Sequence, residues 1–239
     1  MPASHRSLVI ATFASFALHA PAQSLVRDIR PPTTSQRSSS PQEIVDLAGV
    51  AIFRATTDHG QELWRSDGTS LGTYPLKDIR PGTNSSSPSQ LVVAGSFAFF
   101  VATVPGIGAE LWRTDGTATG TILLRDIVPG DGGPVLTELT AFQGRCFFVA
   151  SDPALGRELW SSDGTPAGTT VFADVQPGLG SSFPTGLEVV NGRLFFAASP
   201  PGVGIELCST DGTTPGTGVV IDLQAGSGSS SPRDLTGVG

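Results

Sequence analysis

Short apolar runs separated by turn residues make up most of the chain, and residues 185–232 show this pattern most clearly. There, Asn191-Gly192 lies between two apolar runs, and Asn-Gly in that position is a strong signal for a β-hairpin. A second turn, rich in glycine and threonine, covers residues 211–216. The pattern predicts four short antiparallel strands, at residues 186–190, 193–198, 205–210 and 217–223.

An eight-residue motif, Glu-Leu-Trp-x-x-Asp-Gly-Thr, recurs every 48 residues, with Cys208 in place of the tryptophan in the last copy. The copies begin at Glu62, Glu110, Glu158 and Glu206. A second Gly-Thr, an aspartate and a Pro-Gly pair (Ala-Gly in the fourth copy) follow at constant spacing. A fixed period between about 20 and 50 residues is typical of propellers, solenoids and arrays. Four strands in each period match the size of a propeller blade.

Three of the predicted strands carry two adjacent phenylalanines, at residues 99–100, 147–148 and 195–196. Neighbouring side chains on a strand point to opposite faces of the sheet, so both faces are apolar. A sheet with one face in water alternates apolar and polar residues instead. The predicted fold class is therefore all-β: a β-propeller-like repeat of four-stranded blades, with 48 residues per repeat and four full repeats plus flanking strands. An open stack of sheets is the alternative.

The repeat sets the domain organisation. We expect a signal peptide at residues 1–22, a first strand with a Ser/Pro-rich linker at 23–41, and a repeat domain at 42–239. The units span about residues 42–88, 89–134, 135–184 and 185–232, with a partial fifth unit at 233–239. The chain thus opens with the last strand of one unit and closes with the first strand of another. We expect these terminal strands to close a ring, and a piece of a longer array is the alternative.

The first 22 residues have the features of a secretory signal peptide. Arg6 precedes an apolar run at residues 8–18, and Ala20-Pro21-Ala22 supplies small residues for cleavage after Ala22. The apolar run is too short to span about 30 Å of hydrocarbon. The sequence therefore predicts a secreted, periplasmic or cell-surface protein with no membrane span after cleavage.

Composition and charge narrow the function classes. The chain has 30 glycines and 19 prolines but only 15% charged residues, which disfavours coiled coils and helical bundles. Its 38% hydrophobic content is too high for a disordered chain. The net charge of −7 repels phosphate backbones, so nucleic acid is not expected as a partner.

An aspartate opens the turn of every copy, at Asp67, Asp115, Asp163 and Asp211. An aspartate before glycine accepts backbone N–H groups and holds an Asx turn. A calcium loop gathers several oxygen ligands, whereas each turn here offers one carboxylate. We therefore predict structural turns, no metal site and no cofactor, with calcium as the alternative.

The motif glutamates share a strand face with the aromatic residue two positions later. These pairs are Glu62 and Trp64, Glu110 and Trp112, and Glu158 and Trp160. One hypothesis is a ligand site, in which the carboxylate binds sugar hydroxyls and the indole stacks on the ring. The other is a packed interface between blades, with the glutamate accepting backbone donors of the next unit.

Groups suited to catalysis are few. His59 is the one histidine beyond the predicted signal peptide, and twelve of the 21 acids occupy repeat-equivalent positions, whereas a catalytic pair should break the symmetry. We therefore predict that the protein is not an enzyme, with the paired carboxylates of a glycoside hydrolase as an alternative. Cys146 and Cys208 fall at different points of the repeat, which favours two buried thiols over a disulfide.

Through its Glu-Leu-Trp-x-x-Asp-Gly-Thr motifs, the chain resembles the bacterial ELWxxDGT repeat family over roughly residues 24–239, departing from it at Cys208. Members are typically large exported or surface proteins, and the resemblance implies no established enzymatic activity. We predict an exported, non-catalytic repeat protein that acts as a binding or structural scaffold at or outside the cell surface, with an unidentified protein or glycan partner. A lectin-like, carbohydrate-binding propeller and a glycoside hydrolase are the alternatives.

Overall fold

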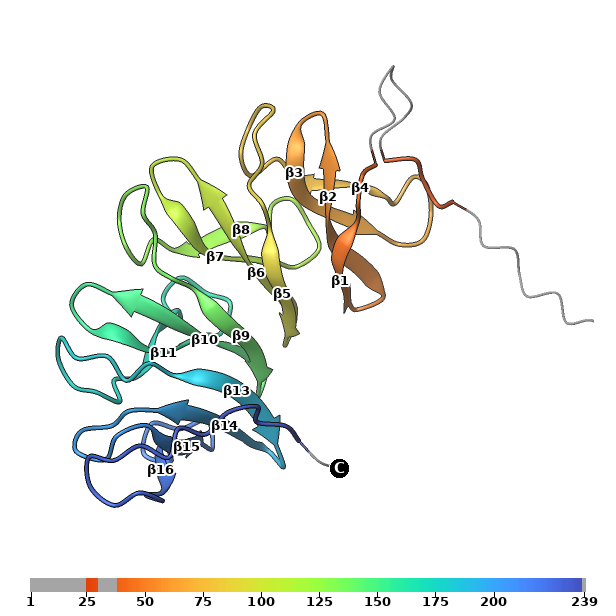
Figure 1. The fold of residues 1–239 in the computed structure, drawn as a ribbon. Coiled ribbons are helices and arrows are strands. Elements are labelled where there is room, and N and C mark those ends of the chain that lie inside the picture. The colour runs from red at the N-terminus through yellow and green to blue at the C-terminus, as the bar shows by residue number, and fades with distance from the viewer. Residues whose placement is uncertain (1–24, 30–37, 238–239) are drawn as a thin grey trace, which may run out of the picture.

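The computed structural model describes residues 25–29 and 38–237, and this part of the chain is all-β, with no helix. Sixteen strands form four antiparallel sheets of four strands each (Figure 1). We call these sheets blades 1 to 4 in chain order. The four-stranded blades of the predicted propeller-like fold are therefore confirmed.

Within each blade the strands pair in sequence order. Blade 1 contains β1 (Gln42–Leu47), β2 (Val50–Thr57), β3 (Gly60–Ser66) and β4 (Tyr74–Lys77). Blade 2 contains β5 (Ser89–Ala94), β6 (Phe97–Val104), β7 (Gly108–Thr114) and β8 (Ile122–Arg125). Blade 3 contains β9 (Thr137–Phe142), β10 (Arg145–Asp152), β11 (Gly156–Ser162) and β12 (Thr170–Ala173). Blade 4 contains β13 (Thr185–Val190), β14 (Arg193–Ala198), β15 (Glu206–Thr210) and β16 (Gly218–Ile221).

The blades follow one another in an open arc (Figure 1). Their first strands, β1, β5, β9 and β13, lie along the inner edge of the arc, where each contacts the first strand of the next blade. Blades 1 and 4 stand at opposite ends of the arc, so the structure does not show the closed ring that we expected.

Apolar side chains fill the space between consecutive blades. We call the face toward the preceding blade the front and the face toward the following blade the rear. Between blades 1 and 2, Ile52 and Leu63 on a rear face pack with Phe100 and Trp112 on a front face. Phe99, on the opposite face from Phe100, belongs to the next core, and both rings are fully buried. The adjacent phenylalanines thus point to two different cores, as their spacing predicts.

Two segments outside the sheets cover the ends of the array. Ile29 packs against Phe53, Ala55 and Trp64 on the front of blade 1. Near the other end, Gly237 N donates to Glu188 Oε1 on blade 4 (3.2 Å). Neither segment forms a strand in its described residues. The two terminal strands of our prediction are therefore coil over their described residues.

The predicted signal peptide lies outside the described residues, as does part of the linker at 23–41. Among the residues that the structure does describe, no helix has the length and apolar character needed to cross a membrane.

Candidate functional site

The motif glutamates are buried and bind the backbone of the loop that leads to the next blade. Glu158 Oε2 accepts a hydrogen bond from Val175 N (2.9 Å), and Glu158 Oε1 accepts one from Ser182 N (2.7 Å). The Ser182 hydroxyl donates to Oε2 (2.5 Å). We call this arrangement a glutamate–serine clamp. It fixes the return loop of its blade through one side chain.

Blades 1 and 4 contain the same clamp, formed by Glu62 with Ser86 and by Glu206 with Ser230. Burial raises the pKa of Glu62 and of Glu158, and the serine hydrogen bonds oppose that rise. At Glu206 the balance is reversed, because the hydrogen bond from the Ser230 hydroxyl outweighs the effect of burial. The Ser230 hydroxyl therefore lowers the pKa of Glu206.

Blade 2 lacks the serine, because Pro134 occupies its place and has neither an N–H nor a hydroxyl group. Glu110 Oε1 accepts hydrogen bonds from Ile127 N (3.1 Å) and Val128 N (3.4 Å). Glu110 Oε2 is buried without a hydrogen-bond partner. Burial raises the pKa of Glu110 to about 7, and the nearby Asp126 carboxylate adds to the rise. Blade 2 therefore holds a carboxyl group that takes up a proton near neutral pH.

The motif tryptophans lie on the front faces of their blades. Trp64, Trp112 and Trp160 are 5%, 8% and 1% exposed, and the paired glutamates Glu62, Glu110 and Glu158 are at most 4% exposed. A sugar cannot stack on an indole ring that the neighbouring blade or terminal segment already covers. In this structure the Glu–Trp pairs therefore offer no surface to a ligand.

The turn aspartates bind the turn that they open. Asp115 Oδ1 accepts hydrogen bonds from Thr117 N (2.9 Å) and from the Thr117 hydroxyl (2.6 Å). The same bonds recur at Asp67, Asp163 and Asp211. The threonine hydroxyl lowers the pKa of each of these aspartates. This is the geometry of an Asx turn.

Each motif is followed by a second Gly-Thr, and the glycine of this pair has a steric role that the sequence did not reveal. A Cβ atom on Gly120 would lie 2.0 Å from Asp115 Oδ1, and Gly72, Gly168 and Gly216 stand equally close to their aspartates. Any side chain there would push the carboxylate out of the turn. Within the described residues, no group of three or more His, Cys, Asp or Glu side chains could hold a metal ion.

Both cysteines are buried and free, and they lie in different cores: Cys146 between blades 2 and 3, and Cys208 between blades 3 and 4. Burial raises the pKa of the Cys208 thiol to about 11. His59 is exposed in the turn before β3 and is distant in sequence from any other histidine.

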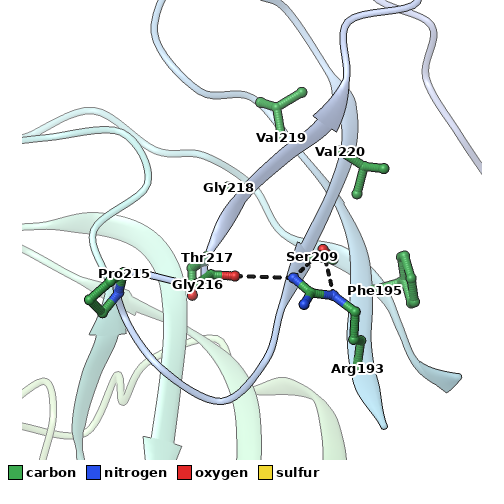
Figure 2. Close-up of a pocket in the computed structure, with 9 residues that line it drawn as sticks. All are labelled: Arg193, Phe195, Ser209, Pro215, Gly216, Thr217, Gly218, Val219 and Val220. Carbon is green, nitrogen blue, oxygen red and sulfur yellow. Dashed lines mark hydrogen bonds between the residues drawn. The ribbon is translucent and has the colours of Figure 1, made fainter. Parts of the chain in front are cut away.

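A pocket of about 480 Å³ opens on the rear of blade 4, beside β16 (Figure 2). Arg193 crosses it and donates to the Ser209 hydroxyl (3.1 Å) and to the Gly216 carbonyl (3.3 Å). Phe195 lines this pocket and is only half-buried, whereas the equivalent Phe99 and Phe147 are fully buried. Phe99 and Phe147 pack in the cores against the next blade, whereas no blade among the described residues lies against the rear face of blade 4.

The inner edge of the arc carries carboxylates that our sequence analysis did not single out. Glu138 on β9 reaches β13, where its Oε2 accepts a hydrogen bond from Leu187 N (3.3 Å). The next residue on β13 is Glu188. Both glutamates are half-buried, so solvent reaches them. Leu187 packs in the core between blades 3 and 4. Glu188 instead lies beside Phe195 and faces the C-terminal segment, where its Oε1 accepts a hydrogen bond from Gly237 N (3.2 Å). The two carboxyl groups therefore come from neighbouring inner strands and lie on different sides of β13.

These two glutamates break the repeat. Gln90 replaces Glu138 in blade 2, and Thr140 replaces Glu188 in blade 3. Glu43 on β1 is the blade 1 equivalent of Glu138, but it forms an ion pair with Arg54 (3.2 Å). No other two consecutive blades carry acids at both positions, and this was the signal in the sequence that could have identified the pair.

No family model matches the chain, and a search of curated proteins finds no match. Several solved structures do match. A puromycin hydrolase matches with 18% identity and a TM-score of 0.44 over 76% of this chain, which spans 29% of that enzyme. An α-L-arabinofuranosidase from Clostridium thermocellum matches with 11% identity and a TM-score of 0.34, over 74% of this chain and 70% of the other. An endo-1,4-β-xylanase from Bacteroides thetaiotaomicron has 13% identity and a TM-score of 0.33, with 75% and 70% covered.

These matches correct two of our predictions. We expected a non-catalytic scaffold that is not an enzyme, whereas the matched structures are hydrolases. At such identities the likeness concerns the fold alone, and it assigns this chain neither a substrate nor catalytic residues.

Proposed function

We propose that the protein is an exported glycoside hydrolase in which Glu138 and Glu188 supply the two carboxyl groups of the reaction. One observation carries this proposal. The two acids lie on adjacent inner strands, on either side of β13, at positions where the other blades do not repeat the pair. A catalytic pair must break the symmetry of a repeat in this way, because a structural acid is needed in every copy.

The chemistry requires two carboxyl groups on either side of a glycosidic bond. One, in its acid form, protonates the leaving oxygen, while the other, as a carboxylate, attacks the sugar directly or activates a water molecule. Glu138 and Glu188 are reachable from solvent at the inner edge of the arc. The motif glutamates are buried, so a substrate cannot reach them in this conformation.

Glu43 provides a matched control, because it occupies the place of Glu138 in blade 1 and makes the same type of contact. Its Oε2 accepts a hydrogen bond from Leu91 N (3.2 Å), as Glu138 Oε2 does from Leu187 N (3.3 Å). Glutamine at either position keeps an acceptor for that N–H group, and E43Q additionally loses the half-exposed ion pair with Arg54, which contributes little to stability. The two variants should differ in activity alone.

The test is hydrolysis of chromogenic aryl glycosides and of arabinoxylan by the wild type and by the E138Q, E188Q and E43Q variants. The first two should lose at least about a hundredfold in kcat, the scale of a lost acid–base group, while E43Q keeps its activity. Equal activity in all four proteins, or no hydrolysis of any glycoside by the wild type, would reject the proposal.

We further propose that the protein belongs to the ELWxxDGT repeat family, is exported with cleavage after Ala22, and needs no metal. The basic start, the short apolar run and the small residues at 20–22 support export. Sequencing the amino terminus of the protein recovered outside the cytoplasm tests this, and the expected first residue is Gln23.

A further inference from the structure

The contact between blades 3 and 4 lacks two side chains that the preceding contact has. Between blades 2 and 3, the Arg125 guanidinium lies 5.5 Å from the centre of the Trp160 ring. Arg125 also donates a hydrogen bond to the Thr169 carbonyl (3.1 Å). At the equivalent positions between blades 3 and 4, the chain has Ala173 and Cys208. A cation and an indole ring are thus both missing from one contact.

The earlier contact, between blades 1 and 2, has the same pair of groups. Lys77 Nζ donates to the Thr121 carbonyl (2.7 Å), and Trp112 occupies the tryptophan position. The cation and the ring are therefore present at two successive contacts and are lost together at the third. The two positions are on different blades but lie side by side between them. Replacing both large side chains with smaller ones therefore leaves one continuous volume unfilled.

A pocket of about 360 Å³ lies at this place, within the range of small-molecule sites. Its lining comes from both blades and includes Ala173, Asp174, Phe196, Cys208, Thr217 and Val219. Phe196 and Cys208 belong to the apolar core between the blades, so one wall of the pocket is apolar.

Two residues that line the pocket supply acceptors near the place of the missing cation. Asp174 Oδ1 is buried without a hydrogen-bond partner. The Thr217 carbonyl is equivalent to the Thr121 and Thr169 carbonyls, which accept from Lys77 and Arg125. Ala173 has no donor to offer to this carbonyl. A buried carboxylate oxygen without a partner costs free energy, which a cationic donor would recover.

We propose that this pocket binds a small organic cation, namely a protonated amine or guanidinium attached to an aromatic or apolar group. The apolar group fills the volume that an indole fills in the preceding contacts. The cation takes the place of the Lys77 and Arg125 side-chain ends and donates to Asp174 Oδ1 and the Thr217 carbonyl. Glu138 and Glu188 do not line the pocket, so this inference is independent of the proposed hydrolase activity.

Tryptamine is a suitable probe because it carries both an indole and an ammonium group. Isothermal titration calorimetry of the full chain should show one site. The D174N variant should bind at least about tenfold more weakly, because a hydrogen bond to a charged group is lost. D126N is the matched control, since Asp126 has the same place in blade 2, and its affinity should equal that of the wild type. Indole-3-propionate, which carries the opposite charge, should not bind.

A double variant, A173R/C208W, restores the side chains of the preceding contact and so should fold. It should abolish tryptamine binding by filling the pocket. The reverse variant, R125A/W160C, empties the contact between blades 2 and 3 and should raise the stoichiometry to two. Absence of tryptamine binding at millimolar concentration, or binding that A173R/C208W leaves unchanged, would overturn the proposal.

Discussion

Blades 2 and 3 share one motif, yet they hold its glutamate differently. In blade 3, Glu158 is bound by the N–H and hydroxyl groups of Ser182, 24 residues further along the chain. In blade 2, Pro134 stands in that place and leaves Glu110 Oε2 without a partner. The motif therefore places the acid between the blades, whereas a residue far outside the motif sets its proton affinity. A repeat that looks uniform in its signature residues can differ in its chemistry.

The largest effect should come from removing the serine hydroxyl where it is used. We expect Ser182→Ala to lower the free energy of unfolding by about 1.5–3 kcal/mol, because it removes the hydrogen bond from the Ser182 hydroxyl to a buried carboxylate. Chemical denaturation at pH 8 measures this. Pro134→Ala, at the same position in blade 2, removes no such bond and should change stability by less than about 1 kcal/mol. Equal losses in the two variants would show that the clamp does not account for the difference between the blades.

The sequence predicted the blades well because their signals are local. The apolar runs and the Asn191-Gly192 turn place β13 and β14 to within one residue, since hairpin formation depends on neighbouring residues. The open arc depends instead on the angle at which whole blades pack, which no short segment encodes. The clamp was not predicted, because its serine lies outside the motif. Aligning the copies would have shown that Pro134 replaces this serine in blade 2.

The pocket between blades 3 and 4 escaped notice for a similar reason. In the sequence, Cys208 breaks the tryptophan pattern, and Ala173 separately breaks the series of basic residues that Lys77 and Arg125 begin. Only the fold brings the two positions together. The inner-edge pair Glu138 and Glu188 also becomes visible only once β9 and β13 are seen to be neighbours.

The unpartnered acid of blade 2 should make stability depend on pH. Burial raises the pKa of Glu110 to about 7 in the folded state, against about 4.3 in an unfolded chain. The folded state thus binds the proton more tightly, and this stabilisation is complete below the unfolded pKa and is lost as pH rises through the folded pKa. Between about pH 5 and pH 8, the free energy of unfolding should fall by about 1–3 kcal/mol from this group, after a reduction for solvent screening.

Glu110→Gln isolates this contribution, because glutamine resembles the protonated acid and does not titrate. The difference in unfolding free energy between the wild type and this variant should change with pH over that range. The difference in unfolding free energy between the wild type and E158Q should change less with pH, because the Ser182 hydrogen bonds oppose the rise in the pKa of Glu158. Pro134→Ser should supply the missing partner and flatten the dependence. If the unfolding free energies of the wild type and E110Q change with pH in the same way, the folded state does not raise the pKa of Glu110.

The smallest effect concerns a feature in which the two blades are alike. Asp115 in blade 2 and Asp163 in blade 3 each accept the same two hydrogen bonds from the threonine two residues later. Replacing either with alanine should lower the free energy of unfolding by about 1 kcal/mol, the scale of a lost side-chain cap. The two losses should agree to within about 0.5 kcal/mol, the scale on which surface substitutions vary, because the two turns make the same hydrogen bonds. Calcium should leave the melting temperature of the wild type unchanged, since each turn offers a single carboxylate that its own threonine already engages. A calcium-dependent melt, or a loss confined to one of the two variants, would show that the turns of blades 2 and 3 differ as their glutamates do.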